Sequence, residues 1–286
     1  MHIFPAVVRS LTLVSALAMV ATGPAFAQIL EKLGDAHRLT PWLLNTGNTI
    51  RFCSYASSET RDLDIAVGEA IADRILLDSS FTSLKSGYGI GGEFADEDLY
   101  ISLTNDCDVV LGMGLGSDAY PAEFTITRPY VSYGYLTIAA DAELNSLNDL
   151  AATRKVGTQM LSYGAYLFRQ YNAVRPADQR WTQLVYADMD LMLTRLLEDT
   201  VGVGIIFGPS WRQLRQQRND SAQVKVLDPV PELASMLNVG AVLLSNNVFM
   251  RTEIDKAITD LVDDGTMAAI LVRTEFDAIG ANAGGF

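Results

Sequence analysis

The stretch Asp108-Val109-Val110-Leu111-Gly112-Met113 is a short run that is apolar after its first residue. A continuous apolar run of this length predicts a strand buried on both faces, as strands in parallel sheets are. The all-apolar run Val201–Phe207 predicts a second strand of the same kind. Other stretches, such as Asp62–Leu77, repeat their apolar residues at helical spacing. Strands and helices therefore alternate along the chain, which predicts an α/β fold with mostly parallel sheets flanked by helices.

The order of the predicted elements indicates two lobes. A strand is predicted at Tyr133–Ala140 and a return strand at Val239–Leu244. A chain that leaves one lobe and comes back makes two crossovers, and hence a hinge. We place lobe 1 at residues 28–137 and 235–286, and lobe 2 at residues 138–234. Within these lobes, a short helix is predicted to begin at Pro121 and one long amphipathic helix to cover Arg251–Thr274.

The N-terminus has the layout of a secretory signal. Leu11–Ala21 is apolar but too short to span a bilayer, and small residues at Ala25 and Ala27 flank Phe26. We predict a signal peptide at residues 1–27, cleaved after Ala27; the alternative is a buried apolar helix. No cysteine follows closely, which argues against a lipid anchor. The mature protein is expected to be exported to the periplasm, soluble and without stable membrane insertion.

Composition excludes several classes of protein. The 286 residues carry 21 Lys and Arg against 34 Asp and Glu, a formal charge of −13. A nucleic-acid-binding protein needs a basic face, so that class is excluded. Two cysteines and two histidines are too few for a zinc finger, an iron–sulfur cluster or a disulfide-dense scaffold. We expect no metal and no cofactor, and no enzyme, because the sequence supplies no matched acid and base.

Five motifs in order resemble one family, the bacterial periplasmic solute-binding proteins of the amino-acid-binding type (family 3). The resemblance implies a two-lobed type II periplasmic-binding-protein fold, a small-molecule ligand and a membrane permease as partner. The motifs that carry it are Leu63–Ala72, Asp108–Met113, Thr127-Arg128-Pro129-Tyr130, Leu147-Asn148-Asp149-Leu150 and Asp264-Gly265-Thr266.

Within this family, four segments resemble the proteins associated with quinoprotein methanol dehydrogenases, namely Arg51–Cys53, Cys107–Val110, Thr127–Tyr130 and Ile205–Pro209. The subgroup carries cysteines at the positions of Cys53 and Cys107, and a W-G-P turn where Phe207-Gly208-Pro209 stands. This resemblance implies a second role, namely that of an accessory or maturation protein. Its partner would then be a quinoprotein dehydrogenase or a cytochrome c rather than a solute.

The sequence departs from the family where the usual ligand is bound. Tyr120 stands at the position of the arginine that holds the amino-acid carboxylate, and Val203–Gly208 lacks the acid expected for the ammonium. A zwitterion would be desolvated there without partners, which is costly. We therefore predict a small polar solute other than a standard amino acid.

Position alone selects the candidate ligand contacts, because open α/β sheets bind ligands at the carboxyl ends of their strands. Ser162 is predicted to cap a helix, and Pro209 to begin one; free amides at such ends suit an anion, although the caps could equally just prevent fraying. Arg128 could bind a carboxylate or pair with an acid across the hinge. The full candidate set is Ser54, Tyr55, Met113, Gly114, Tyr120, Arg128, Ser162, Tyr163, Gly208 and Pro209.

Two further features leave alternatives open. A disulfide between Cys53 and Cys107 is the default in an exported protein, with two buried thiols as the alternative. A simple strand register leaves them about 10 Å out of step, so bridging would need a shifted register. Arg212, Arg215 and Arg218 form a basic stripe, interpreted as a solvated helix face or as a docking surface for an acidic partner.

Overall fold

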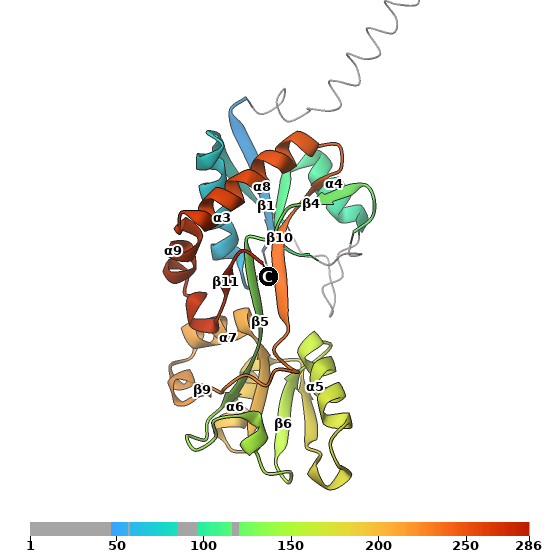
Figure 1. Cartoon of the computed structure of the whole chain (residues 1–286), viewed down its shortest axis with the longest axis vertical. Helices are drawn as coiled ribbons and strands as arrows, with labels where there is room; N and C mark the ends of the chain where they lie inside the picture. The colour runs from blue at the N-terminus through green and yellow to red at the C-terminus, as the bar shows by residue number, and fades with distance from the viewer. Residues whose placement is uncertain (1–46, 57, 85–95, 116–119, 286) are drawn as a thin grey trace, which may run out of the picture. The chain divides into compact units, whose positions relative to one another are not determined.

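The computed structural model describes residues 47–285 except 57, 85–95 and 116–119, so the predicted signal lies outside the described residues. The first part of the chain alternates strands and helices (Figure 1). In order it forms β1 (Thr49–Tyr55), α3 (Arg61–Arg74), β2 (Asp78–Leu84), α4 (Asp96–Asn105), β3 (Val109–Gly114), β4 (Phe124–Ile126) and β5 (Val131–Ala139).

The second part continues the alternation and then returns. It forms the 3-10 turn η1 (Leu147–Asp149), β6 (Lys155–Gln159), α5 (Tyr163–Ala173), η2 (Ala177–Gln179), β7 (Thr182–Tyr186), α6 (Met189–Leu197), β8 (Val203–Phe207), α7 (Gly208–Gln217), η3 (Asn219–Gln223) and β9 (Lys225–Val226). The return consists of β10 (Met236–Leu244), α8 (Val248–Asp263), α9 (Thr266–Arg273), η4 (Asp277–Ile279) and β11 (Asn282–Ala283).

Two sheets share the strand β5. In sheet A, β2, β1 and β3 are parallel neighbours, and β10 lies antiparallel between β3 and β5. In sheet B, β7, β6 and β8 are parallel neighbours, and β5 lies antiparallel beside β8. Each sheet thus places three parallel strands beside one antiparallel strand, with β4 and β11 added in sheet A and β9 in sheet B. The α/β class predicted from the sequence is confirmed.

The chain passes between the sheets within β5. Val131–Gly134 pair with β10 in sheet A, whereas Tyr135–Ile138 pair with β8 in sheet B. Figure 1 shows β5 (green) and β10 (orange) running side by side. The division into two lobes at residues 137/138 and 234/235 stays a prediction. The largest buried core includes side chains from α3, α8 and α9 and also from α6 and α7.

Two predicted helices are wrong. Residues 121–123 form a turn rather than a helix, and the chain then enters β4, where Ile126 pairs with Val242. The predicted helix over Arg251–Thr274 is two helices, because Gly265 adopts a φ of +82°, which ends α8 and which glycine accepts without strain. The backbone amide of Thr266 then donates to Oδ1 of Asp264 at the start of α9.

Cys53 and Cys107 form a disulfide, with their Cα atoms 5.7 Å apart. The register is unshifted: Cys53 pairs with Val110, so Cys107 is three residues out of step, as the sequence indicated. The expected 10 Å separation is nevertheless wrong, because Cys107 is not extended. Its amide donates to Ser102 O at the end of α4, and the turn there brings it back to β1.

Among the described residues, none of the helices combines the length and the apolarity needed to cross a bilayer.

Candidate functional site

A buried carboxylate anchors the segment that leads from β1 into α3. Asp64 is fully buried, and its Oδ2 accepts a hydrogen bond of 2.7 Å from Thr60 Oγ1. Its Oδ1 accepts one of 2.6 Å from the hydroxyl of Tyr130, which itself accepts the backbone amide of Gly112 at 2.7 Å. Burial raises the pKa of Asp64 to about 6, although both hydrogen bonds oppose the shift. This network fixes the start of α3 against β3 and β5.

Gly112 is required by this network. Its φ is +77°, and a Cβ there would lie 2.5 Å from Oδ2 of Asp64. Only glycine combines that backbone conformation with so close an approach of the carboxylate. Gly112, which lies inside β3, therefore leaves the space that the Asp64 carboxylate occupies.

A second carboxylate in the same segment reaches the other sheet's helix. Ser210, in the first turn of α7, lies 2.8 and 2.9 Å from the two carboxylate oxygens of Glu59 and donates to them. Ser210 is buried, and burial raises the pKa of Glu59 while the hydrogen bond lowers it. The start of α7 thus faces a carboxylate supplied by the chain itself, in keeping with the preference of helix N-termini for negative charge.

Two tyrosines of β5 feel the charge of this carboxylate, and both pack on Phe207, which directly precedes α7. The rings of Tyr133 and Tyr135 each lie 5.4 Å from the ring of Phe207, centroid to centroid. Burial raises the pKa of both tyrosines, and the negative charge of Glu59 adds to the shift in each case. We call Glu59, Tyr133, Tyr135, Phe207 and Ser210 the Glu59 site. It combines an acidic group, aromatic rings and hydroxyls, and Tyr133 and Tyr135 stand on either side of the point where β5 passes from one sheet to the other.

The start of α5 adjoins this site through Tyr135. Ser162 caps α5, accepting the amide of Ala165 at 3.0 Å. Polar interaction with the backbone of Gly164 and Tyr163 opposes the rise that burial causes in the pKa of Tyr135. A Cβ on Gly164 would lie 2.4 Å from the Tyr135 ring, so glycine permits this contact. The start of α5, which is predicted to suit an anion, therefore lies against a side chain of the protein itself.

A further contact joins the start of α3 to α7. Arg212 on α7 is buried, forms an ion pair with Asp62 and donates to Thr274 O at 2.6 Å. Its guanidinium also lies 4.6 Å from the ring centroid of Phe276. The interpretation of Arg212 as part of a solvated or docking stripe is therefore wrong. Its apolar contact and its two polar partners explain why the charge is buried.

The structure brings together only part of the predicted set. Gly208 and Pro209 form the buried first turn of α7 beside Ser210, while Ser162 and Tyr163 begin α5. The Tyr163 side chain is half exposed and stacks on Tyr166.

Other predicted contacts are not among the residues of the Glu59 site. Ser54, Tyr55 and Met113 are buried at the strand ends, and Met113 and Tyr55 belong to a core cluster with the disulfide. The hydroxyl of Tyr120 donates to the backbone oxygen of Gly114 at 2.9 Å.

Arg128 is directed toward α8. Its backbone amide donates to Asp255, and its guanidinium hydrogen-bonds to Thr259. This is a contact with the outer helix of sheet A rather than with the residues that meet at the Glu59 site.

Sequence reasoning missed Glu59 and Ser210. Both have a positional signal, since Glu59 follows β1 and Ser210 follows β8 at their carboxyl ends. Neither belongs to a motif, and only the fold shows that the two strand ends meet. Among the described residues, no group of three or more His, Cys, Asp or Glu side chains is placed to hold a metal ion.

No model of a protein family matches the sequence, and no curated protein matches it either. Solved structures do resemble it. A substrate-binding protein of a polar amino acid ABC uptake transporter from Streptococcus thermophilus is 17% identical, with a TM-score of 0.62 over 85% of this chain and 91% of its own. The L-cystine solute receptor of Neisseria gonorrhoeae, unliganded and open, is 18% identical, with a TM-score of 0.61 over 84% and 95%.

The second substrate-binding domain of GlnP from Lactococcus lactis, in its open conformation, is 15% identical, with a TM-score of 0.63 over 80% of this chain and 96% of its own. The chain has the type II periplasmic-binding-protein fold. At these identities the likeness concerns the fold, which agrees with the fold implied by the five sequence motifs. In this fold, the Glu59 site lies where β5 joins the two sheets.

Proposed function

We propose that the protein is a solute-binding receptor, which binds a small polar solute at the Glu59 site and delivers it to a membrane permease. The observation that carries the proposal is the contact between Glu59 and Ser210, because it joins the segment before α3 to the start of α7. A ligand that contacts both residues would hold the two sheets together. The proposal includes two lobes, a hinge at the crossovers, secretion to the periplasm and a binding role without catalysis.

The charge of the site selects the class of solute. Glu59 supplies negative charge, and Tyr133 and Tyr135 add hydroxyls and aromatic faces. Such a site favours a ligand with hydrogen-bond donors or a positive group, since aromatic faces also attract cations. Tyr120, at the position where the family has its carboxylate-binding arginine, bonds to Gly114 instead. We therefore propose an amine or another donor-rich solute rather than a standard amino acid.

Arg61 bears on the exclusion of standard amino acids as ligands. It lies two residues after Glu59, its Nε is buried without a hydrogen-bond partner, and none of the described residues forms an ion pair with it. If amino acids bind, Arg61 is the candidate for their carboxylate, because Arg212, equally near in sequence through Ser210, is already paired with Asp62.

A second candidate is the accessory role beside a quinoprotein dehydrogenase or cytochrome c. The observation that favours it is the Cys53–Cys107 disulfide, which joins the two cysteine positions on which that resemblance rests. In this role the same fold would bind a protein partner.

The experiment is a thermal-shift screen of the purified mature protein against amines, polyols, alcohols, carboxylates and the standard amino acids. A bound ligand raises the midpoint of unfolding according to its concentration and dissociation constant. Shifts with amines or polyols but not with amino acids support the proposal. The absence of any shift, together with co-purification of a dehydrogenase, would overturn it in favour of the accessory role.

A further inference from the structure

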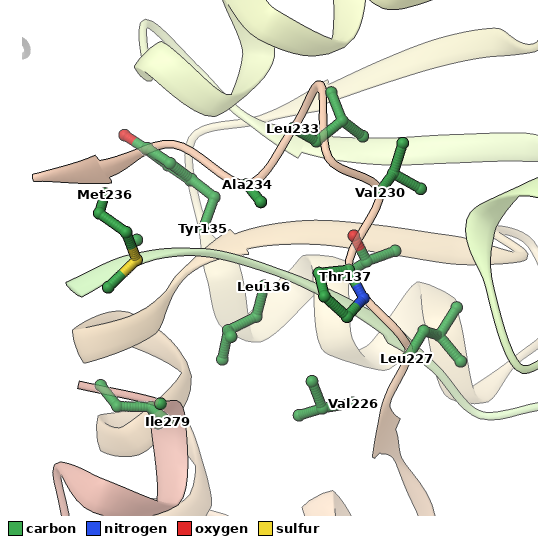
Figure 2. A pocket seen from close by; sticks show the side chains of 13 residues that line it. Tyr135, Leu136, Thr137, Val226, Leu227, Val230, Leu233, Ala234, Met236 and Ile279 are labelled. Atoms are coloured by element: carbon green, nitrogen blue, oxygen red, sulfur yellow. The ribbon is translucent and has the colours of Figure 1, made fainter. Parts of the chain in front are cut away.

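An apolar pocket of about 280 Å³ lies beside the point where the chain passes between the sheets (Figure 2). One wall is the middle of β5, where Tyr135, Leu136 and Thr137 line the pocket. The opposite wall is the returning chain between β9 and β10, and Ile279 of η4 contributes from the C-terminal segment. The pocket is therefore built by both crossovers.

The pocket exists because the two crossovers differ in length. Val226 of β9 pairs with Ile138, and Met236 of β10 pairs with Gly134. Between these pairs β5 has only residues 135–137, whereas the returning chain has residues 227–235. The excess chain cannot follow β5, and Figure 2 shows it passing over β5 as a loop with Leu233 and Ala234.

The chemistry of the lining is uniform. None of the residues that line the pocket is charged. On the returning chain, Leu227, Val230 and Leu233 are buried, while Ala234 is exposed. Thr137 contributes a hydroxyl to which no described residue is hydrogen-bonded. A cavity of this kind disfavours an ionised ligand, because its charge would be desolvated without a partner.

We propose that this pocket is a second binding site, which adjoins the Glu59 site through Tyr135, for a neutral and largely apolar small molecule with at most one hydrogen-bonding group. An apolar cavity of about 150 Å³ accepts benzene, so this one accommodates a molecule of one or two rings or a medium-length alcohol. Its ligand would contact both crossovers at once, through Leu136 on β5 and Val230 on the returning chain.

The probe is the neutral two-ring dye 6-propionyl-2-dimethylaminonaphthalene, whose short-wavelength fluorescence rises in an apolar site. Titration of the intact protein is expected to give a saturable rise. 1-Octanol is expected to displace the dye at a concentration at least tenfold lower than octanoate, which has the same chain but a negative charge. Displacement by both compounds at equal concentrations would overturn the proposal, because it would indicate general surface binding.

Ala234→Phe fills the mouth of the pocket from an exposed position, so the fold is expected to tolerate it. The matched control is Ala177→Phe, at an exposed alanine of η2 outside the pocket. We expect the first variant to lose the fluorescence rise and the control to keep it. An equal rise in both variants would overturn the proposal, and the octanol–octanoate comparison on the unaltered protein decides it should Ala234→Phe not fold.

Discussion

The hydroxyl of Tyr130 donates to Oδ1 of Asp64 at 2.6 Å, and neither side chain is exposed to solvent. Tyr130 precedes β5 and Asp64 lies in the first turn of α3, so one hydrogen bond joins segments that are 66 residues apart. A carboxylate in such a place is held by donors but loses its hydration. Since the raised pKa of Asp64 is dominated by burial, the lost hydration outweighs the donors.

The pKa of Asp64 predicts that stability falls as the pH rises through the mildly acidic range. The folded protein holds the proton up to about pH 6, whereas the unfolded chain releases it near the ordinary value of 3.8. Between those values the folded state binds more protons, so the free energy of unfolding decreases with pH, by about 3 kcal/mol for this group. Asp64→Asn should remove that decrease, as measured by urea unfolding between pH 4 and 7.

The matched control is Asp178→Asn, at an exposed position in η2. It should keep the wild-type dependence on pH. Thr60, Tyr130, Tyr133 and Asp62 face or influence Asp64 and stay unchanged in both variants. A decrease of the same size in Asp64→Asn would assign the dependence to another group, such as Glu59.

Tyr130→Phe should cost about 1–3 kcal/mol of unfolding free energy. The substitution leaves the Asp64 carboxyl without one donor and the Gly112 amide without its acceptor, both in a buried site. Tyr100→Phe is the control, because Tyr100 is half exposed on α4. Equal losses in the two variants, measured by chemical denaturation, would show that the buried hydroxyl contributes nothing specific.

Gly112→Ala and Gly265→Ala separate backbone strain from a steric clash. The two glycines have similar φ values, +77° and +82°, but a Cβ meets Asp64 at Gly112 and open space at Gly265. Gly265→Ala should lose about 1 kcal/mol, and Gly112→Ala at least about 2 kcal/mol more. The two midpoints of urea unfolding measure the difference; coincident midpoints would mean that Asp64 moves away freely.

Much of the fold follows from local patterns in the sequence. The apolar run that ends at Met113 predicts β3, because a strand with neighbours on both sides and cover on both faces lacks the alternation of polar and apolar residues. The break at Gly265 was missed because apolar spacing continues across α8 and α9, whereas the glycine acts through its φ. Cys107 was misplaced because strand register describes extended chain, and this residue lies in the turn after α4.

The site is less accessible to sequence reasoning than the fold. The sequence places Pro209 at the start of a helix after the strand that ends at Phe207, and the structure has Gly208 and Pro209 in the first turn of α7, because their places depend only on β8. Glu59 and Ser210 are 151 residues apart, and their contact depends on how β5 joins the sheets. No local pattern encodes such a pairing, whereas Arg128 stands within a recognisable motif and is therefore predicted as a ligand contact, although it bonds to α8.

Removing the disulfide should destabilise the protein by about 4 kcal/mol on the chain-entropy argument, because the bond closes a loop with a sequence separation of 54 residues. The variant is Cys53→Ala with Cys107→Ala, which keeps both buried positions apolar. Denaturation with and without reductant checks the assignment. The wild type should lose unfolding free energy when it is refolded with reductant, whereas the double variant should not respond. If the wild type is fully unfolded with reductant and its stability is still unchanged, the bond is contradicted.

Glu59→Gln tests the charge at the proposed solute site. Glutamine still accepts the hydrogen bond from Ser210 but carries no charge, so the fold should persist. The free energy of unfolding should stay equal or rise, because burying a charge costs free energy. The raised pKa of Glu59, which burial causes, reflects that cost. Binding of the amine or donor-rich solute found by thermal shift should weaken at least tenfold, as calorimetry would measure. In the wild type, affinity for the solute should also fall as the pH is lowered and Glu59 takes up a proton.

The matched control is Glu143→Gln, which alters an exposed acid elsewhere in the chain and should change neither stability nor binding. Undiminished binding in Glu59→Gln would place the solute away from this carboxylate.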